Sequence, residues 1–164
     1  MNLRTLQRPL AAYTGLITLM LACTGASAAP TPNDAKGLWM SGDKGAILEF
    51  KDCPDTAGAL CATIVWDKDA GTALDTCGML ISKLKRYDDD AWRDGWVFDP
   101  RTKKHYKGAV RVNKDSQPNQ LPMRAYIGTE ILGETAEMTR VSAIPAGRNP
   151  RRSPPPPKGR TAPS

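Results

Sequence analysis

Residues 104–112 read KHYKGAVRV, and their side chains alternate in character along most of the stretch. One set of alternate positions is apolar or small, and it comprises Tyr106, Gly108, Val110 and Val112. The polar side chains fall on the intervening positions, namely His105, Lys107, Arg111 and Asn113. Because successive side chains of a strand point to opposite faces, this period of two predicts a half-buried β-strand.

Runs of similar character recur on both sides of this stretch. They cover residues 46–51, 60–66, 80–86, 95–99, 120–127 and 134–141. Turn-forming sequences such as Asp99-Pro100-Arg101 separate them, and no stretch after residue 28 has the pattern of a long helix. We therefore expect about seven or eight short strands, joined by loops that are too short for helical crossovers.

A meander of this kind has two unpaired edges unless it closes on itself. Gly37-Leu38-Trp39 lies in the first expected strand, and Arg140 lies in the last, on the same face as Met138. An arginine on an apolar face needs a partner, and the ring of Trp39 would supply one by cation–π stacking. This pairing resembles the lipocalin-like barrels. The sequence therefore predicts an all-β fold, a small antiparallel up-and-down barrel that Trp39 and Arg140 close at one end.

The first 28 residues have the three parts of a secretory signal peptide. Arg4 and Arg8 precede an apolar run that ends at Cys23, and small residues follow at Ala26-Ser27-Ala28. We expect cleavage after Ala28, with lipoprotein processing at Cys23 as the alternative. The apolar run is shorter than the roughly 20 residues that span a bilayer. The expected product is therefore periplasmic or secreted, and it is not transmembrane once processed.

The remaining chain divides into three parts. Residues 29–35 are expected to form a linker, residues 36–142 the β-barrel domain, and residues 143–164 a tail. The tail is rich in proline and basic residues and has few side chains that could build a core. Such a composition predicts a disordered or polyproline-like segment.

The positive charge of the chain is concentrated at its ends. The whole sequence has 23 basic and 17 acidic residues, a net charge of +6. Two basic residues lie in the signal peptide and five in the tail, which leaves 16 basic against 17 acidic residues elsewhere. A nearly neutral domain argues against a nucleic-acid binder. The basic tail remains suited to contact with an anionic envelope surface.

Three cysteines follow the signal peptide, and an oxidising compartment favours a disulfide between two of them. Cys53 and Cys61 enclose a turn-rich stretch between two strand-like runs, so their pairing would staple a hairpin. Cys77 is then left over, either as a buried apolar residue or as the alternative partner of Cys61.

We find no catalytic constellation in the sequence. There is no Gly-x-Ser-x-Gly motif, and the only histidine, His105, falls on the polar face of its strand. Asp88-Asp89-Asp90 suggests a calcium loop, but Trp92 occupies the next position where an oxygen ligand is required. A zinc site is disfavoured by the lack of a Cys-x-x-Cys pair. We therefore assign no catalytic residue, no metal and no cofactor, and a hydrolytic enzyme is the least favoured function.

Short motifs occur in order along the whole domain. They are Gly37-Leu38-Trp39, Leu60-Cys61-Ala62-Thr63-Ile64-Val65-Trp66, Cys77-Gly78, Trp96-Val97-Phe98-Asp99-Pro100, Tyr126-Ile127-Gly128 and Thr139-Arg140-Val141. By these motifs the chain resembles the bacterial domain-of-unknown-function family 2147, a family of small exported proteins. Ala62 and Ala125 stand where that family usually has glycine. The resemblance implies an exported β-rich domain and carries over no catalytic residue.

Aromatic side chains offer a way for a small barrel to hold an apolar ligand. The candidate ligand-binding residues are Trp66, Trp96, Phe98, Tyr106 and Tyr126. The alternative is that they serve as the core of a small domain. We expect a non-enzymatic protein that binds a small apolar or amphipathic ligand, or an envelope partner. The competing hypothesis is an interaction module that acts through the basic tail on anionic envelope material.

Overall fold

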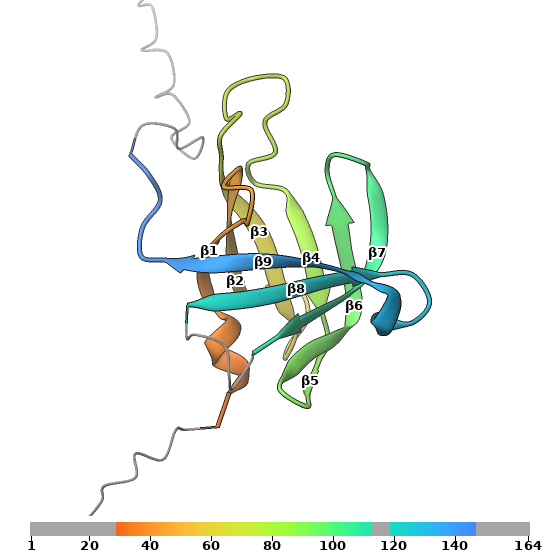
Figure 1. Ribbon diagram of the computed structural model, residues 1–164. Coiled ribbons are helices and arrows are strands. Elements are labelled where there is room, and N and C mark those ends of the chain that lie inside the picture. The colour runs from red at the N-terminus through yellow and green to blue at the C-terminus, as the bar shows by residue number, and fades with distance from the viewer. Residues whose placement is uncertain (1–28, 113–118, 147–164) are drawn as a thin grey trace, which may run out of the picture.

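The computed structural model describes residues 29–112 and 119–146 (Figure 1). The predicted signal peptide and all but the first four residues of the predicted tail lie outside the described residues.

Within these ranges, nine strands form one antiparallel sheet (Figure 1). The strands are β1 (Gly37–Met40), β2 (Ala46–Asp52), β3 (Leu60–Asp67), β4 (Leu80–Leu84), β5 (Arg86–Asp88), β6 (Ala91–Asp99), β7 (Lys104–Arg111), β8 (Gln120–Tyr126) and β9 (Glu134–Val141). Two short 3-10 helices accompany them, η1 (Pro32–Ala35) and η2 (Glu130–Leu132).

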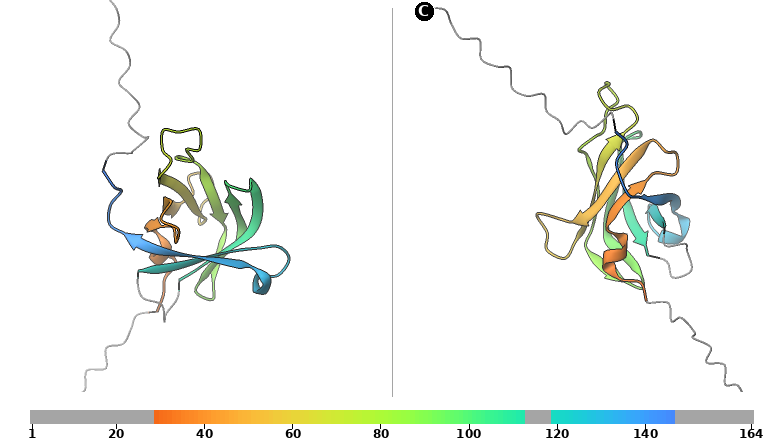
Figure 2. Two further views of the ribbon diagram at one scale, coloured as in Figure 1. Left: turned by 45° about the horizontal axis from the view of Figure 1, so that its top comes forward. Right: turned by 90° about the vertical axis from the view of Figure 1, so that its left-hand side faces the viewer.

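The sheet closes into a barrel (Figure 2). β1 pairs with both β2 and β9, and β4 pairs with both β3 and β6. Eight strands therefore form a ring in the order β1-β2-β3-β4-β6-β7-β8-β9, and β5 is an extra strand beside β6. The predicted up-and-down barrel is confirmed. Because consecutive strands alternate in direction, the β3–β4 and β8–β9 loops leave from one end, and the β2–β3 loop leaves from the other.

Two strand boundaries differ from the prediction. The strand expected over residues 80–86 is interrupted at Lys85, although the Lys85 amide still donates to the Arg93 carbonyl across the sheet. β6 begins at Ala91 rather than at residue 95, because a bulge between Trp92 and Gly95 breaks the alternation that the sequence pattern relies on.

Gly95 permits the close approach of β4 and β6 where the barrel closes. A Cβ at this position would lie only 1.7 Å from the carbonyl oxygen of Lys83. The residue is therefore required for the closure of the sheet and not for a turn.

Within the segment predicted as a linker, residues 29–35, the structure places a short helix. This helix is η1, whose start is stabilised by Pro32 and by a bond from the Thr31 amide to the Asp34 carboxylate. Ala35 at its end is fully buried. A helix of one turn has too few residues for a recognisable period, and contacts with the barrel hold it.

The barrel interior is densely filled toward the end that η1 covers. Most of the largest fully buried side chains belong to the interior cluster, namely Trp39, Phe50, Leu60, Leu84, Leu121, Met138 and Val110. Leu60 and Phe50 lie on the strands that flank the β2–β3 loop, which leaves from this same end. We call this the closed end, and the opposite end the open end.

Candidate functional site

Trp39 and Arg140 lie together at the closed end. The guanidinium carbon of Arg140 lies 4.0 Å from the ring centroid of Trp39, which is the stacking predicted for this pair. Arg140 also donates to the carbonyl oxygens of Lys36 and Asp34, where η1 joins β1. One side chain thus ties the last strand to the first strand and to the helix before it.

Two indole groups bind the backbone of η1 at the closed end. Trp39 Nε1 donates to the Ala35 carbonyl oxygen at 2.9 Å, and Trp92 Nε1 donates to the Pro32 carbonyl oxygen at 3.1 Å. Both rings belong to the buried cluster inside the barrel. The closed end is therefore shut by hydrogen bonds as well as by packing, since each buried indole has its partner.

Burial decreases along β8 and β9 toward the open end. Leu121 and Met138 face each other across the two strands, and each is 1% exposed. Met123 and Ala136 form the next pair on the same face; Met123 is half-buried and Ala136 is exposed. The inner wall therefore passes from a filled core to a surface that solvent reaches.

The same gradient runs along β7. Val110 is fully buried, whereas Tyr106, four residues closer to the open end and on the same face, is half-buried. Tyr106 pairs with Val97, and Val97 pairs with Ser82 on β4. The Ser82 side chain is completely buried, and its hydroxyl has no hydrogen-bond partner among the described residues. An unpaired hydroxyl therefore lies in the wall at the level of Tyr106.

The remaining aromatic candidates do not gather with Tyr106. Trp96 and Phe98 lie on the opposite face of β6 from Val97, where both rings contact the exposed His105 at centroid distances of 5.4 and 4.7 Å. The predicted outward position of His105 is therefore confirmed. This packing on the outer face depends on the register between β6 and β7. The sequence pattern of a single strand does not predict that register.

Tyr126 and Trp66 also lie apart from the inner wall near Tyr106. Tyr126 pairs with Lys107, a neighbour of Tyr106 that faces the other way. Trp66, on β3, is half-buried and pairs with Ile47 of β2. Among the five candidates, Tyr106 is thus the one whose position the strand alternation assigns to the inner wall.

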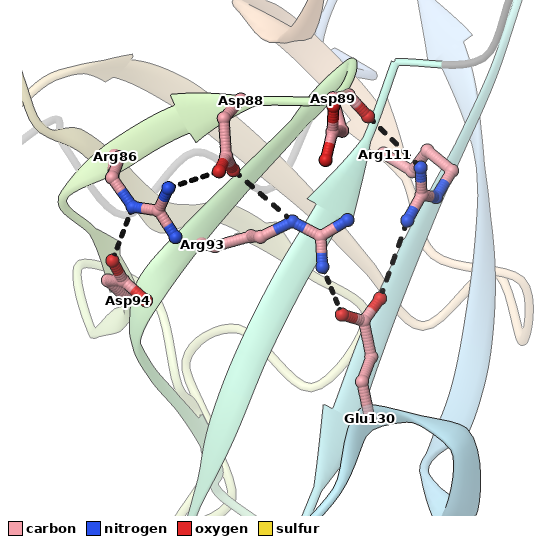
Figure 3. Close-up of polar contacts among 7 residues, drawn as sticks. All are labelled: Arg86, Asp88, Asp89, Arg93, Asp94, Arg111 and Glu130. Carbon is pink, nitrogen blue, oxygen red and sulfur yellow. Dashed lines mark hydrogen bonds and ion pairs between the residues drawn. The ribbon is translucent and has the colours of Figure 1, made fainter.

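A network of ion pairs covers the outer face of β5, β6 and β7 (Figure 3). The Glu130 carboxylate on η2 receives Arg93 from β6 and Arg111 from β7. Arg93 also contacts the Asp88 carboxylate, and Arg86 forms an ion pair with the same carboxylate. No sequence pattern predicts this cluster, because its members are far apart in the chain and meet only through strand register.

An open hollow of about 390 Å³ lies beside this network. Arg111, Arg124, Glu130 and Ile131 line it. Two of these side chains are guanidinium groups, which bind carboxylates and phosphates through paired N–H donors. Glu130, on the same lining, pairs with Arg111, whereas Arg124 donates to neutral oxygens, so Arg124 is the guanidinium best placed to attract an anionic group.

The disulfide predicted between Cys53 and Cys61 is present. Both sulfur atoms lie close to the Asp55 carboxylate, and this trio is the one cluster in the described ranges with the spacing of a metal site. The disulfide removes both thiolates, so the cluster does not offer the ligands that a soft metal prefers.

Cys77 is a free thiol in the β3–β4 loop. Burial and the neighbouring Asp75 carboxylate raise its pKa to about 11, so the reactive thiolate is scarce at neutral pH. The pKa of Asp75 itself is lowered, because its carboxylate accepts hydrogen bonds from the Gly71 and Cys77 amides. This pair organises the loop and does not provide a nucleophile.

The comparison with protein families concerns nearly the whole barrel. Residues 37–140 match the model of an uncharacterized protein family conserved in bacteria, DUF2147. The chain belongs to this family. The predicted family is therefore confirmed, and the DUF2147 match begins at the strand of Trp39 and ends at Arg140, the two residues that meet at the closed end.

Among solved structures, this DUF2147 domain is similar to protein HP1028 from the human pathogen Helicobacter pylori, which is described as belonging to the lipocalin family. The sequence identity is 18%, the TM-score is 0.50, and the match covers 65% of this chain and 82% of that chain. At this identity the similarity shows the fold, a lipocalin-like barrel. No curated protein matches the sequence.

Proposed function

We propose that this DUF2147 protein is an exported, non-enzymatic binder of a small apolar or amphipathic ligand, which enters the barrel at the open end. The burial gradient carries the proposal. The inner wall is filled at the closed end, whereas Ala136 and Tyr106 on the same wall are accessible toward the open end. Barrels of this kind hold ligands where side chains leave their interior unfilled.

The residues at the open end suit an amphipathic molecule. Ala125, Ala136 and Met123 would contact an apolar chain, and Tyr106 combines an apolar ring with a hydroxyl. The unpaired Ser82 hydroxyl lies at the level of Tyr106 and offers a hydrogen bond to one polar group of the ligand. Trp66, Trp96, Phe98 and Tyr126 remain candidates for contact outside this wall.

Export belongs to the same proposal. The signal sequence over residues 1–28 predicts it, and the Cys53–Cys61 disulfide is of the kind that persists in oxidising compartments. Across the described ranges, no helix is long and apolar enough to cross a bilayer. We propose the periplasm, or release from the cell, as the destination.

The first experiment is native mass spectrometry of the mature chain purified from its own periplasm, followed by extraction of any bound small molecule.

The second experiment is titration with a fluorescent fatty-acid probe. Ala136→Trp places a large ring on the inner wall, and we expect it to weaken probe binding at least tenfold. Glu137→Trp puts the same ring one residue away on the outer face and should leave binding unchanged. Equal binding by both variants would remove the barrel interior as the site.

A further inference from the structure

The β8–β9 loop, residues 127–133, leaves its aliphatic side chains in water. Ile127, Ile131 and Leu132 are 76%, 86% and 83% exposed. A single exposed aliphatic residue is ordinary, but three on one short loop form a patch of the kind that marks an interaction surface.

Polar contacts hold the loop in this orientation. Arg124 donates through Nε to the Glu130 carbonyl oxygen, and through Nη2 to the Ile131 carbonyl oxygen at 2.7 Å. Its Nη1 donates to the Thr135 hydroxyl at 2.7 Å. The loop backbone is thus bound to the barrel while Ile131 and Leu132 point away from it. The usual arrangement, apolar side inward and polar side outward, is reversed.

Three arginine side chains, Arg93, Arg111 and Arg124, contact the base of this loop. Arg93 and Arg111 reach the Glu130 carboxylate from two neighbouring strands (Figure 3), and Arg124 bonds only to neutral oxygens in the contacts above. Arg93 and Arg111 are thus paired with the Glu130 carboxylate, and Arg93 also contacts Asp88. Arg124 donates instead to the Glu130 carbonyl oxygen. Arg111 and Arg124 also border the open hollow, within reach of an incoming anion.

We propose that the β8–β9 loop docks this protein on an anionic phospholipid surface. Ile127, Ile131 and Leu132 enter the boundary between headgroups and acyl chains, and Arg111 and Arg124 bind lipid phosphate. Amphipathic segments bind membrane surfaces by this combination of apolar burial and cationic attraction. A soluble anion would fill the hollow but leave the three aliphatic side chains in water, so a lipid surface satisfies both features at once.

The test is co-sedimentation of the full mature chain with vesicles of phosphatidylethanolamine and phosphatidylglycerol. We expect the double variant Ile131→Ser, Leu132→Ser to lower partitioning at least tenfold, because two aliphatic groups no longer leave water. Arg111→Gln should lower it about fivefold. Vesicles of phosphatidylcholine alone should bind the unmodified chain weakly.

Matched controls distinguish vesicle binding by the loop from non-specific apolar adsorption and from attraction by the basic tail. Leu74→Ser removes an aliphatic side chain that is 72% exposed on a different loop, and Arg101→Gln removes an arginine whose side chain is 82% exposed. Neither should change partitioning. Every variant retains the tail, and the comparison is repeated at high salt, where attraction by the tail is screened but apolar insertion persists.

Three outcomes would overturn the proposal. One is equal partitioning of the unmodified chain and the double serine variant. Another is equal binding to the phosphatidylcholine vesicles. The third is a self-association of the unmodified chain, seen by sedimentation velocity, that the double variant abolishes, since the patch would then face a second copy of the protein. Because the replaced side chains are exposed, unchanged thermal melting is expected to confirm that the variants are folded.

Discussion

The two ends of the barrel are built in opposite ways. At the closed end, two indole groups and the Arg140 guanidinium donate hydrogen bonds to backbone carbonyl oxygens in and beside η1. The side chains beneath them are fully buried. At the open end, alanines and a half-buried tyrosine occupy the inner wall, and the adjoining loops carry exposed aliphatic groups. Along β7, β8 and β9, side-chain burial is thus greatest at the closed end, and the open end of these strands is accessible for contact with other molecules.

The largest expected effect comes from breaking the closed end at its centre. Trp39→Ala removes a ring that is 1% exposed, the surface on which Arg140 stacks, and the bond to Ala35. We expect a loss of about 4 kcal/mol in the free energy of unfolding, measured by urea denaturation. Ala136→Trp at the open end serves as the counterpart and should change stability by less than about 1 kcal/mol. Similar losses in both variants would contradict the asymmetry.

The disulfide is the next test, since the β2–β3 loop also belongs to the closed end. Replacing Cys53 and Cys61 together by serine should cost about 2.5 kcal/mol, because the unfolded chain regains the freedom of a short loop. The measurement is thermal or urea unfolding, with the single variant Cys77→Ser as control. If the control loses as much as the double variant, the β3–β4 loop is more important to stability than its exposure indicates.

A smaller effect is expected at the start of η1. Asp34→Ala removes the carboxylate that accepts the Thr31 amide, and a helix cap of this kind contributes about 1 kcal/mol. Asp69→Ala provides a comparison in the β3–β4 loop at the open end. Unchanged stability of the Asp34 variant in urea would mean that the indole bonds alone hold η1 in place.

The smallest effect on stability is expected at Cys77, whose replacement by serine should cost less than about 0.5 kcal/mol. Its chemistry offers a sharper measurement. Since its pKa is raised to about 11, the thiol stays protonated up to that pH, and its alkylation by iodoacetamide should keep accelerating between pH 8 and about 11. The urea-unfolded chain should instead level off near the pKa of an ordinary cysteine, about 8.5. In Asp75→Asn the profile should shift toward lower pH, and a folded chain that levels off near pH 9 would contradict the assignment.

Local alternation predicted most of the barrel. The period of two around Val110 and the pairing of Cys53 with Cys61 follow from features that lie within one strand or its turn. The stacking of Arg140 on Trp39 was expected because an arginine on the apolar face of its strand needs a partner. The helix η1 was missed because a single turn has no period and is held by indole groups from β1 and β6.

The candidate site was less accessible to prediction. The outward packing of Trp96 and Phe98 on His105 requires the register between two strands, which a bulge near Gly95 shifts. The contacts of Glu130 with Arg93 and Arg111 join three separate elements. Such contacts arise only in the tertiary structure, and no short sequence motif predicts them.

The position of Arg140 has a consequence for how the chain is made. Its guanidinium donates to carbonyl oxygens 104 and 106 residues earlier, so the last strand to leave the ribosome closes the contact that the first structured turn requires. Contacts of such long range form late and slowly in folding. A nascent chain that stops short of Arg140 lacks the contacts that complete its closed end. If the proposed export takes place through a channel that accepts unfolded chains, such a delay would favour transport.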